Sequence, residues 1–396
     1  MPKRNFLHRE KEMASRDYSG KELDYLKAVL ASGNLSGLTG GQFTSRFEHA
    51  FAKIIGTRYA VAMNSCMSAL HSALLCAGVR ASHEVICDSE FIFGALAVLY
   101  CNAIPTFVDI DPVTNNMDAS KLEAAITERT RSIIVTHAWG LPAEMDKIMR
   151  IARKHRLLVI EDCAESILAT YKGRCTGTWG HIECFSFQAS KQLSLGDGGM
   201  ATTSSTKLWR GLANNAGAPT FLSVAYGQDY NYRINEPTAA IGLAQLPKLP
   251  NFIAQLRRNA SFYDSAVEGC RFLRLQRGPK HAQHSFYHWA ATFDGDRHGL
   301  SLNEFRRIIQ SSPLKSISVG YTGMAAYQHP VIQDRTAHAF HCEANRRSHA
   351  HYPRGLCPVA EHVIPRLVLG YLVEPQDTAR READILHTLL RRLEGP

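Results

Sequence analysis

The stretch FSFQASKQLSLGDGGM (residues 185–200) decides how this sequence is interpreted. A short apolar run, expected to be a buried strand, leads to a single amine at Lys191, and Gly196, Gly198 and Gly199 follow within ten residues. Glycine adopts positive φ at little cost, so the chain can turn sharply after the lysine and begin another strand. An ordinary hairpin would need the same glycines. A lysine partly removed from water has a lowered pKa and can attack a carbonyl, so we expect a reactive amine at this turn.

Strand-like and helix-like segments alternate around this stretch. Short apolar strands are predicted at EVICD (84–88), SIIVT (132–136) and LLVI (157–160), and amphipathic helices at 42–55 and 143–155. Strands that alternate with helices indicate an α/β fold with a mainly parallel sheet. Such sheets bind ligands at the carboxyl ends of their strands.

Polar residues follow four of the predicted strands, and the carboxylate at Asp162 is the most informative of them. A carboxylate at the end of a buried strand is costly unless it has a partner. The ring nitrogen of pyridoxal phosphate (PLP) would be such a partner: an ion pair about 4 Å long is worth roughly 4 kcal/mol at an effective dielectric constant near 20. That is about three pKa units, which keeps the ring protonated and able to withdraw electrons from a substrate. The polar residues at these strand ends are Asn64, Ser65, Cys66, His137, Glu161, Asp162, Ser186, Gln188 and Lys191.

Several ordered motifs resemble those of one family. EDCAES (161–166), followed after YKGRCTGTWGHIECFSFQASK by LGDGGM (195–200), is similar to the DegT/DnrJ/EryC1/StrS family of sugar and aminocyclitol aminotransferases, which have PLP fold type I. The resemblance covers most of the chain and is strongest over residues 34–246. It implies a large domain with a mainly parallel seven-stranded sheet flanked by helices, plus a smaller α+β C-terminal domain. Pro247 and Pro250 should interrupt a helix, which divides the chain into residues 1–245 and 246–396.

The resemblance also implies roles for matching residues. Lys191 would carry the cofactor as an internal aldimine and then move a proton between substrate and cofactor, while Asp162 would pair with the pyridine nitrogen. Ala164 would pack on one face of the ring, and Phe91, or alternatively Phe93, on the other. The phosphate and the remaining ring edge would be contacted by Ser65, Cys66, Met67, Ser68, Ser186, Gln188 and, from a neighbouring subunit, Asn235. The implied assembly is therefore a homodimer with active sites at the subunit interface.

Two residues depart from the family pattern. Met67 stands where the phosphate loop usually has threonine, so Ser65 or Ser68 would have to supply the lost hydroxyl. Glu165 stands where histidine or glutamine is common; an ionised carboxylate beside the ring would repel the phenolate, so Glu165 would point away, be protonated, or alter the reactivity. Substrate contacts are expected from Thr39, His137, Trp139 and Tyr321, although His137 could equally be a core histidine.

Composition excludes several other classes of function. The net charge of +9 comes from scattered Lys and Arg residues, so no nucleic-acid partner is expected. None of the ten cysteines forms a CxxC pair, which indicates free thiols in a reducing compartment. No secretory signal or membrane-spanning run is visible, so the expected location is the cytoplasm. His281, His284 and His288 would suit zinc only on a helix, and their sequence is strand-like, so no metal is expected.

The sequence thus predicts an aminotransferase. It would move an amino group from glutamate or glutamine to a keto-sugar, nucleotide-linked or free, or to a keto-cyclitol. One alternative keeps the cofactor and changes the reaction to a dehydration, another elimination or an aromatising synthesis. Lys191 argues against the sugar 3-dehydratase branch, which resembles this family but has histidine in place of the lysine. A second alternative is a PLP-binding partner without catalysis, which the intact Lys191 and Asp162 disfavour.

Overall fold

The predicted sheet of mainly parallel strands forms the centre of the molecule. The computed structural model describes residues 16–37, 41–217, 230–346 and 350–394. Its largest sheet has seven strands in the order β1-β9-β8-β5-β4-β2-β3, of which β8, β5, β4, β2 and β3 are parallel and β1 and β9 pair antiparallel. Their bounds are β1 Tyr59–Met63, β2 Glu84–Asp88, β3 Ile104–Val108, β4 Thr130–Thr136, β5 Leu158–Asp162, β8 Ile182–Ser186 and β9 Gly199–Thr203.

Helices cover both faces of this sheet, as the near-continuous apolar strands require. Successive strand residues point to opposite faces. Cys87 and Ile134 therefore pack in the core that includes α4 and α5, whereas Ile86 and Ile133 pack in the core that includes α7. The helices around the large sheet are α2 Glu22–Ser32, α3 Gln42–Ile55, α4 Cys66–Cys76, α5 Ile92–Tyr100, α6 Ala119–Leu122, α7 Met145–Lys154, α8 Thr206–Ala216 and α9 Glu236–Gln245.

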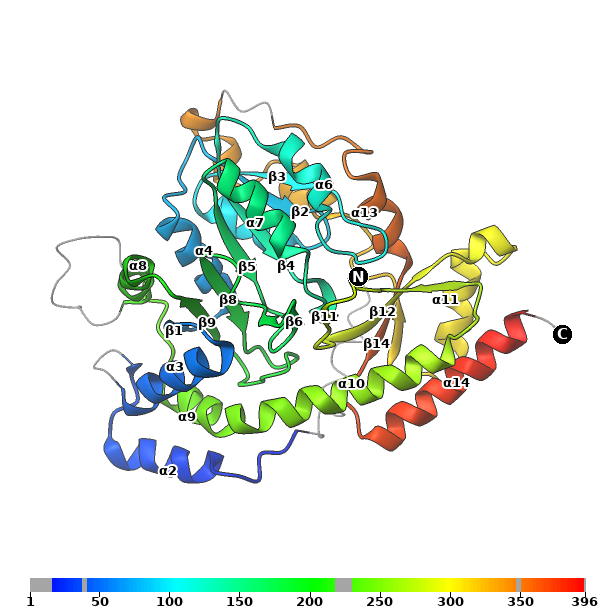
Figure 1. Cartoon of the computed structure of the whole chain (residues 1–396), viewed down its shortest axis with the longest axis horizontal. Coiled ribbons are helices and arrows are strands. Elements are labelled where there is room, and N and C mark those ends of the chain that lie inside the picture. The colour runs from blue at the N-terminus through cyan, green and yellow to red at the C-terminus, as the bar shows by residue number, and fades with distance from the viewer. Residues whose placement is uncertain (1–15, 38–40, 218–229, 347–349, 395–396) are drawn as a thin grey trace.

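The C-terminal part contains a four-stranded antiparallel sheet in the order β10-β12-β14-β13. The long helix α10 leads into it, and α14 lies alongside α10 (Figure 1). The strands are β10 Leu273–Leu275, β12 His288–Phe293, β13 Ile317–Val319 and β14 Leu367–Tyr371; the helices are α10 Leu249–Ala266, α11 Leu302–Ser311, α12 Pro330–Gln333, α13 Pro358–Val363 and α14 Gln376–Glu394. A third, small sheet joins β11 Ala282–Gln283, β6 Thr170–Tyr171 and β7 Arg174–Cys175.

The predicted interruption of the helix at the two prolines is a single 3-10 turn. This turn, Leu246–Lys248, lies between α9 and α10, and the backbone keeps helical dihedral angles through it. Pro247 and Pro250 each lie in the first turn of the helical segment that they belong to, a place where proline is tolerated. The division of the chain into two domains at this point stays a prediction.

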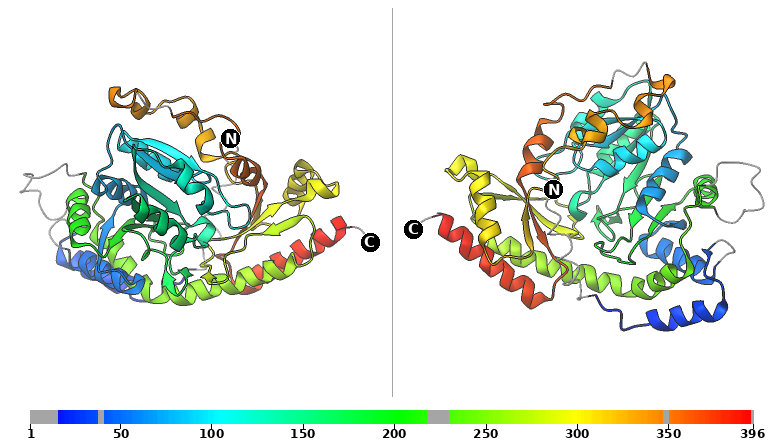
Figure 2. Two further views of the ribbon diagram at one scale, coloured as in Figure 1. Left: turned by 45° about the horizontal axis from the view of Figure 1, so that its top comes forward. Right: turned by 180° about the vertical axis from the view of Figure 1, so that it is seen from behind.

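Residues 325–346 and 350–364 return to the large sheet. The Tyr352 hydroxyl donates to the Pro105 carbonyl at 2.7 Å, and the Asp109 carboxylate accepts from the backbone N–H groups of Val359 and Ala360. Both views in Figure 2 show this orange segment against the cyan strands and helices. Among the residues that the structure describes, no helix combines the length and the apolar character needed to cross a lipid bilayer.

Candidate active site

Lys191 lies in the loop that joins β8 to the antiparallel strand β9. Its backbone N–H donates to the Gln188 carbonyl at 2.8 Å, which closes a tight turn. The Gln188 side-chain oxygen accepts from the Ser190 N–H at 2.8 Å and from the Ser190 hydroxyl at 2.7 Å. Gln188 therefore shapes the turn that presents the lysine. Its predicted place beside the cofactor stays a prediction.

The glycines of this loop have two different functions. Gly196 and Gly198 have φ values of 86° and 145°, as predicted for a turn that needs positive φ. Gly199 differs, because a Cβ there would lie well inside 3.0 Å of the Ser65 and Cys66 backbones. Gly199 is needed because β9 closely approaches the start of α4 here. The prediction that Gly199 adopts positive φ is wrong.

The Lys191 amine lies between a carboxylate and an aromatic ring. Its Nζ is 3.2 Å from Glu165 Oε1 and 3.9 Å from the ring centre of Tyr287, and the side chain is 15% exposed. Burial alone would lower the pKa of Lys191, but Tyr287, Glu165 and Asp162 outweigh it and raise the pKa above its ordinary value. The expectation of a lowered pKa is therefore wrong for the cofactor-free protein, because buried anionic groups surround the amine.

Asp162 ends β5 and is 4% exposed. Its Oδ1 accepts from the Ala164 N–H at 3.1 Å, and Cys66 Sγ lies 4.0 Å away. Burial raises the pKa of Asp162 to about 6, although the Ala164 N–H and the Lys191 ammonium lower it. A buried carboxylate with this shift gains most from a cationic partner such as a pyridinium nitrogen.

The N-terminus of α4 offers backbone donors for a phosphate. Ser65 is the N-cap residue, and its hydroxyl oxygen accepts from the Ser68 N–H at 3.1 Å. The Ser68 hydroxyl donates to Asn64 Oδ1 at 2.6 Å, so its proton is already used inside the cap. The Ser65 hydroxyl lies 2.9 Å from the Ser68 hydroxyl, so both serines expected to replace the lost threonine hydroxyl are bonded within the cap. Met67 packs against the neighbouring core, and the Ser186 hydroxyl accepts from the Gln188 N–H at 3.4 Å.

Three predicted aromatic residues form one cluster. The Trp139 ring centre lies 5.2 Å from that of Phe91 and 4.8 Å from that of Tyr321, and Phe91 and Tyr321 are 5.8 Å apart. Phe93 is 47% exposed, so the structure places Phe91, the first of the two candidates, in this cluster. The Trp139 Nε1–H donates to Glu90 Oε1 at 2.9 Å, and burial raises the pKa of Glu90.

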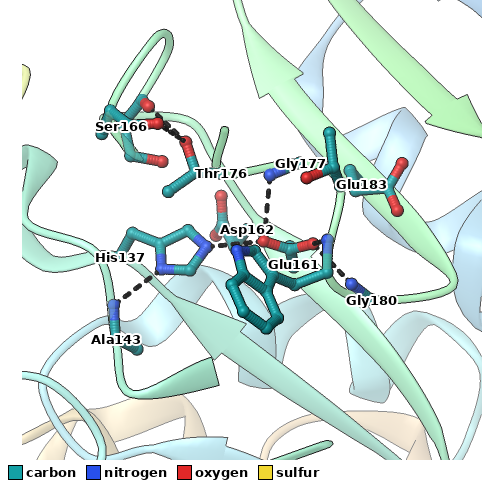
Figure 3. A network of polar contacts seen from close by, with 12 residues as sticks. His137, Ala143, Glu161, Asp162, Ser166, Thr176, Gly177, Gly180 and Glu183 are labelled. Atoms are coloured by element: carbon teal, nitrogen blue, oxygen red, sulfur yellow. Dashed lines mark hydrogen bonds and ion pairs between the residues drawn. The ribbon is translucent and has the colours of Figure 1, made fainter. Parts of the chain in front are cut away.

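His137 lies behind the site, within a buried network (Figure 3). Its Nδ1 accepts from the Ala143 N–H at 3.1 Å, so its Nε2 carries the proton and donates to Glu161 Oε2 at 3.0 Å. The Glu161 carboxylate also accepts from the N–H groups of Gly177 and Gly180. His137 has no exposed surface, and both of its ring nitrogens are hydrogen-bonded, so it is a core histidine. The expected contact between His137 and substrate is therefore wrong.

The same network contains the one group of metal-ligand types found among the described residues. Ligand atoms of His137, Glu161 and Cys163 lie within 4.8 Å of one another. Burial opposes ionisation of Glu161, but the hydrogen bonds from His137 and the backbone N–H groups hold the pKa of Glu161 below its ordinary value. These donors satisfy the carboxylate without a cation, so the cluster is a hydrogen-bonded support for β5.

Two predicted positions lie apart from this pocket. The Asn235 side chain accepts from the Thr238 N–H at 2.9 Å and caps α9, and its contact with the phosphate of a second subunit stays a prediction. Thr39 lies outside the described residues.

Sequence reasoning missed three residues around the lysine: Tyr287, Glu90 and Arg16. The Arg16 guanidinium donates to the Lys191 and Gln192 carbonyls. Their distance along the chain from the lysine motif left no local signal.

The residues gathered around Lys191 fit PLP. Asp162 is a buried carboxylate that would suit the ring nitrogen, the first turn of α4 has backbone donors that would suit the phosphate, and the Phe91 ring packs beside Trp139 and Tyr321. Lys191 supplies an amine within the same group of charges. Residues from β5, α4, the lysine loop and the segment before β12 thus converge on a single place, as expected at the carboxyl ends of the sheet.

The comparisons with known proteins agree with this geometry. The model of the DegT/DnrJ/EryC1/StrS aminotransferase family matches residues 17–353. GDP-perosamine synthase of Caulobacter vibrioides is 39% identical over 64% of this chain and 69% of its own length. UDP-N-acetyl-3-dehydro-alpha-D-glucosamine 3-aminotransferase of Acidithiobacillus ferrooxidans is 34% identical over 88% of both chains. An aminotransferase structure from Psychrobacter cryohalolentis superposes with a TM-score of 0.84 at 26% identity, covering 96% of this chain and 98% of its own. The chain belongs to the DegT/DnrJ/EryC1/StrS family and is a PLP-dependent aminotransferase of the sugar-modifying type.

Proposed function

We propose that this enzyme transfers an amino group from glutamate or glutamine to a keto-sugar carried on a nucleoside diphosphate. The names of the two relatives described above contain a GDP-linked and a UDP-linked sugar, and the second alignment spans 88% of both chains. Among the acceptors expected from the sequence, this favours nucleotide-linked sugars over free sugars and cyclitols. The observation that carries the proposal is the close approach of Lys191, Asp162 and Glu165 in a chain with this similarity.

Each residue of the pocket has a defined task in this reaction. Bound PLP supplies an electron-withdrawing ring that allows an amino group to move between donor and acceptor. The Asp162 carboxylate holds positive charge at the ring nitrogen, and the first turn of α4 binds the phosphate. Lys191 binds the cofactor aldehyde and, once released, holds or removes the proton at the reacting substrate carbon. Phe91 and Trp139 exclude water from one side of the pocket.

We also propose that the enzyme is a homodimer whose active sites lie at the subunit interface. Helix α5 is apolar throughout, yet Phe93 and Tyr100 on it are 47% and 57% exposed. A second copy of the chain would bury this face, and the exposed Asn235 at the start of α9 would reach the partner's phosphate site.

All ten cysteines are free, which supports a reducing compartment, so we place the enzyme in the cytoplasm.

The test follows the bound cofactor. The purified protein is incubated with PLP, and then with glutamate or glutamine, while the visible spectrum reports conversion of the cofactor from its aldehyde to its amine form. Adding a keto-sugar linked to UDP or GDP should restore the aldehyde form and yield an amino-sugar detectable by mass spectrometry. A cofactor that neither donor converts would contradict transamination and favour an elimination reaction.

The attachment residue is tested separately. Borohydride reduction of the PLP-loaded protein should place the cofactor on the peptide that contains Lys191. Lys191→Ala should lose this adduct, whereas Lys207→Ala, at an exposed lysine of α8, should retain it. An adduct that persists in Lys191→Ala would refute the assignment of the lysine.

A further inference from the structure

The free amine of Lys191 lies in a site built from two distant segments. Glu165 follows β5 and contacts the ammonium through Oε1 at 3.2 Å. Tyr287 directly precedes β12 and places its ring centre 3.9 Å from the same nitrogen. One partner is a buried carboxylate and the other is the face of an aromatic ring, and both attract a cation.

Glu165 is held so that only one of its oxygens is offered to the lysine. Its Oε2 accepts from the Trp139 N–H at 3.1 Å, and its side chain is 7% exposed. Its backbone carbonyl accepts from Gln192 Nε2 at 2.6 Å, which ties it to the lysine loop itself. Burial raises the pKa of Glu165, whereas the Lys191 ammonium and the Trp139 N–H lower it. A carboxylate fixed in this way cannot follow a lysine that moves far.

Tyr287 is fixed just as firmly. Its N–H donates to the Trp139 carbonyl at 2.9 Å, and its hydroxyl lies 2.9 Å from the hydroxyl of Ser190, the residue before the lysine. The preceding residue, Phe286, has a φ of 54°, a conformation that costs free energy for a bulky side chain. The chain therefore accepts local strain at the point where it directs the Tyr287 ring toward Lys191.

We propose that Glu165 and Tyr287 form a resting site that holds the Lys191 amine as an ammonium in the cofactor-free protein and, during the reaction, once the released amine has accepted a proton. This inference rests on the proposed role of Lys191 in the reaction. Tyr287 is a positioning residue: it acts on the lysine through its ring face and keeps the released amine close to the substrate carbon. Glu165, which departs from the family pattern, balances the charge of that amine.

Other ionisable groups face the amine and enter the same balance. Asp162 on β5 attracts the ammonium, and burial raises the pKa of the Cys66 thiol on α4, which keeps that group neutral. Arg16 donates to the Lys191 and Gln192 backbone carbonyls and also interacts electrostatically with Tyr287. The carboxylates and the Tyr287 ring therefore dominate the environment of the amine.

The test measures how readily Lys191 loses its proton in the full-length chain freed of PLP. Trace labelling with acetic anhydride, which reacts only with neutral amines, is carried out from pH 7 to pH 11 and quantified by mass spectrometry, with the exposed Lys207 as an internal reference. In wild type the Lys191 labelling midpoint should lie above that of Lys207. Tyr287→Leu should raise the labelling rate at pH 8 by about fivefold, the effect of losing one partly buried cation–π contact. Glu165→Gln should raise it by about tenfold, because a charge partner is lost.

Tyr287→Phe is the matched control, since it keeps the ring face and loses only the hydroxyl bond to Ser190. Its midpoint should lie between those of wild type and Tyr287→Leu, because the Tyr287 hydroxyl also raises the pKa of Lys191 through its charge. A larger pocket opening would raise labelling at every pH without moving the midpoint, so the midpoint is the decisive readout. If Lys191 titrates like Lys207 in wild type, or if neither Tyr287→Leu nor Glu165→Gln moves its midpoint, the resting site is refuted. An adduct away from Lys191 in the borohydride experiment would instead refute the proposed function and leave these midpoints unaffected.

Discussion

Tyr287 and Trp139 are joined backbone to backbone, with the Tyr287 N–H donating to the Trp139 carbonyl at 2.9 Å. Trp139 follows β4 of the large sheet, and Tyr287 precedes β12 of the small sheet. Trp139 has a φ of 60°, so bulky residues with left-handed backbone stand on both sides of this junction. Such conformations persist only where the surroundings fix them. The junction therefore holds the two sheets in one arrangement around Lys191.

Gly140, next to Trp139, should not tolerate a side chain. It has a φ of 98°, and a Cβ would lie 2.9 Å from the Glu165 carbonyl and from the Phe286 nitrogen. Gly140→Ala should lower the free energy of unfolding by about 3 kcal/mol or more, because backbone strain and steric overlap add. Gly33→Ala, at an exposed helix end with a φ of 67° and no neighbour within 4 Å, should cost only about 1 kcal/mol. Equal losses in urea unfolding would contradict the close approach at Gly140.

Gly199 should control cofactor affinity. A Cβ at this position would push the Ser65 and Cys66 backbones away from β9 and disturb the first turn of α4. Gly199→Ala should therefore weaken PLP binding at least about tenfold, which corresponds to the loss of roughly one charge-assisted hydrogen bond. Gly196→Ala is the control, since Gly196 has positive φ but no neighbour within 4 Å. PLP titration followed by absorbance should separate the two, and a normal affinity in Gly199→Ala would exclude α4 as the phosphate site.

Glu236 should be a major source of stability far from the pocket. This buried carboxylate accepts from the N–H groups of Phe43 and Thr44 and from the Thr44 hydroxyl, and so caps the start of α3. Glu236→Ala leaves these donors without a partner and should cost about 3 kcal/mol. Glu123→Ala, which removes an exposed carboxylate paired with Lys154, should leave the thermal midpoint nearly unchanged. Similar midpoints for both variants would argue against the cap.

Asp162 should destabilise the cofactor-free fold at neutral pH. Its pKa is raised from 3.8 to about 6, so between these pH values the folded protein holds a proton that the unfolded chain has lost. Stability from this group is thus lost as the pH rises, and reaches a deficit of up to about 3 kcal/mol above pH 6. Asp162→Asn should raise the thermal midpoint of the cofactor-free protein at pH 7.5, with no gain near pH 4. A gain of equal size at both pH values would contradict the pKa shift. The same variant should bind PLP more weakly.

The sequence predicted those parts of the site that lie in continuous motifs. Lys191, Asp162 and the start of α4 follow apolar strands, and the alternation of strands and helices predicted the sheet that brings them together. Tyr287 could not be predicted in this way, because it acts from nearly a hundred residues beyond the lysine and its neighbours FYHWAATF carry only a strand signal. The pKa of Lys191 was predicted in the wrong direction, since burial was visible in the pattern but the contact between Glu165 and the Lys191 amine was not. His137 shows the same limit: its position at a strand end was correct, and only the structure reveals Glu161 beside it.

Glu161 and Asp162 are neighbours on β5 and point to opposite faces of the sheet. The Asp162 carboxylate, proposed to serve the cofactor, therefore takes its position from hydrogen bonds made by Glu161 on the opposite face, where His137 and Glu161 have no exposed surface. A protein engineer who wishes to change the accepted sugar can vary the loop before β12 or the aromatic cluster while leaving this anchor intact. Replacement of His137 would instead displace Asp162 indirectly, through Glu161, and would be expected to reduce turnover with every sugar alike.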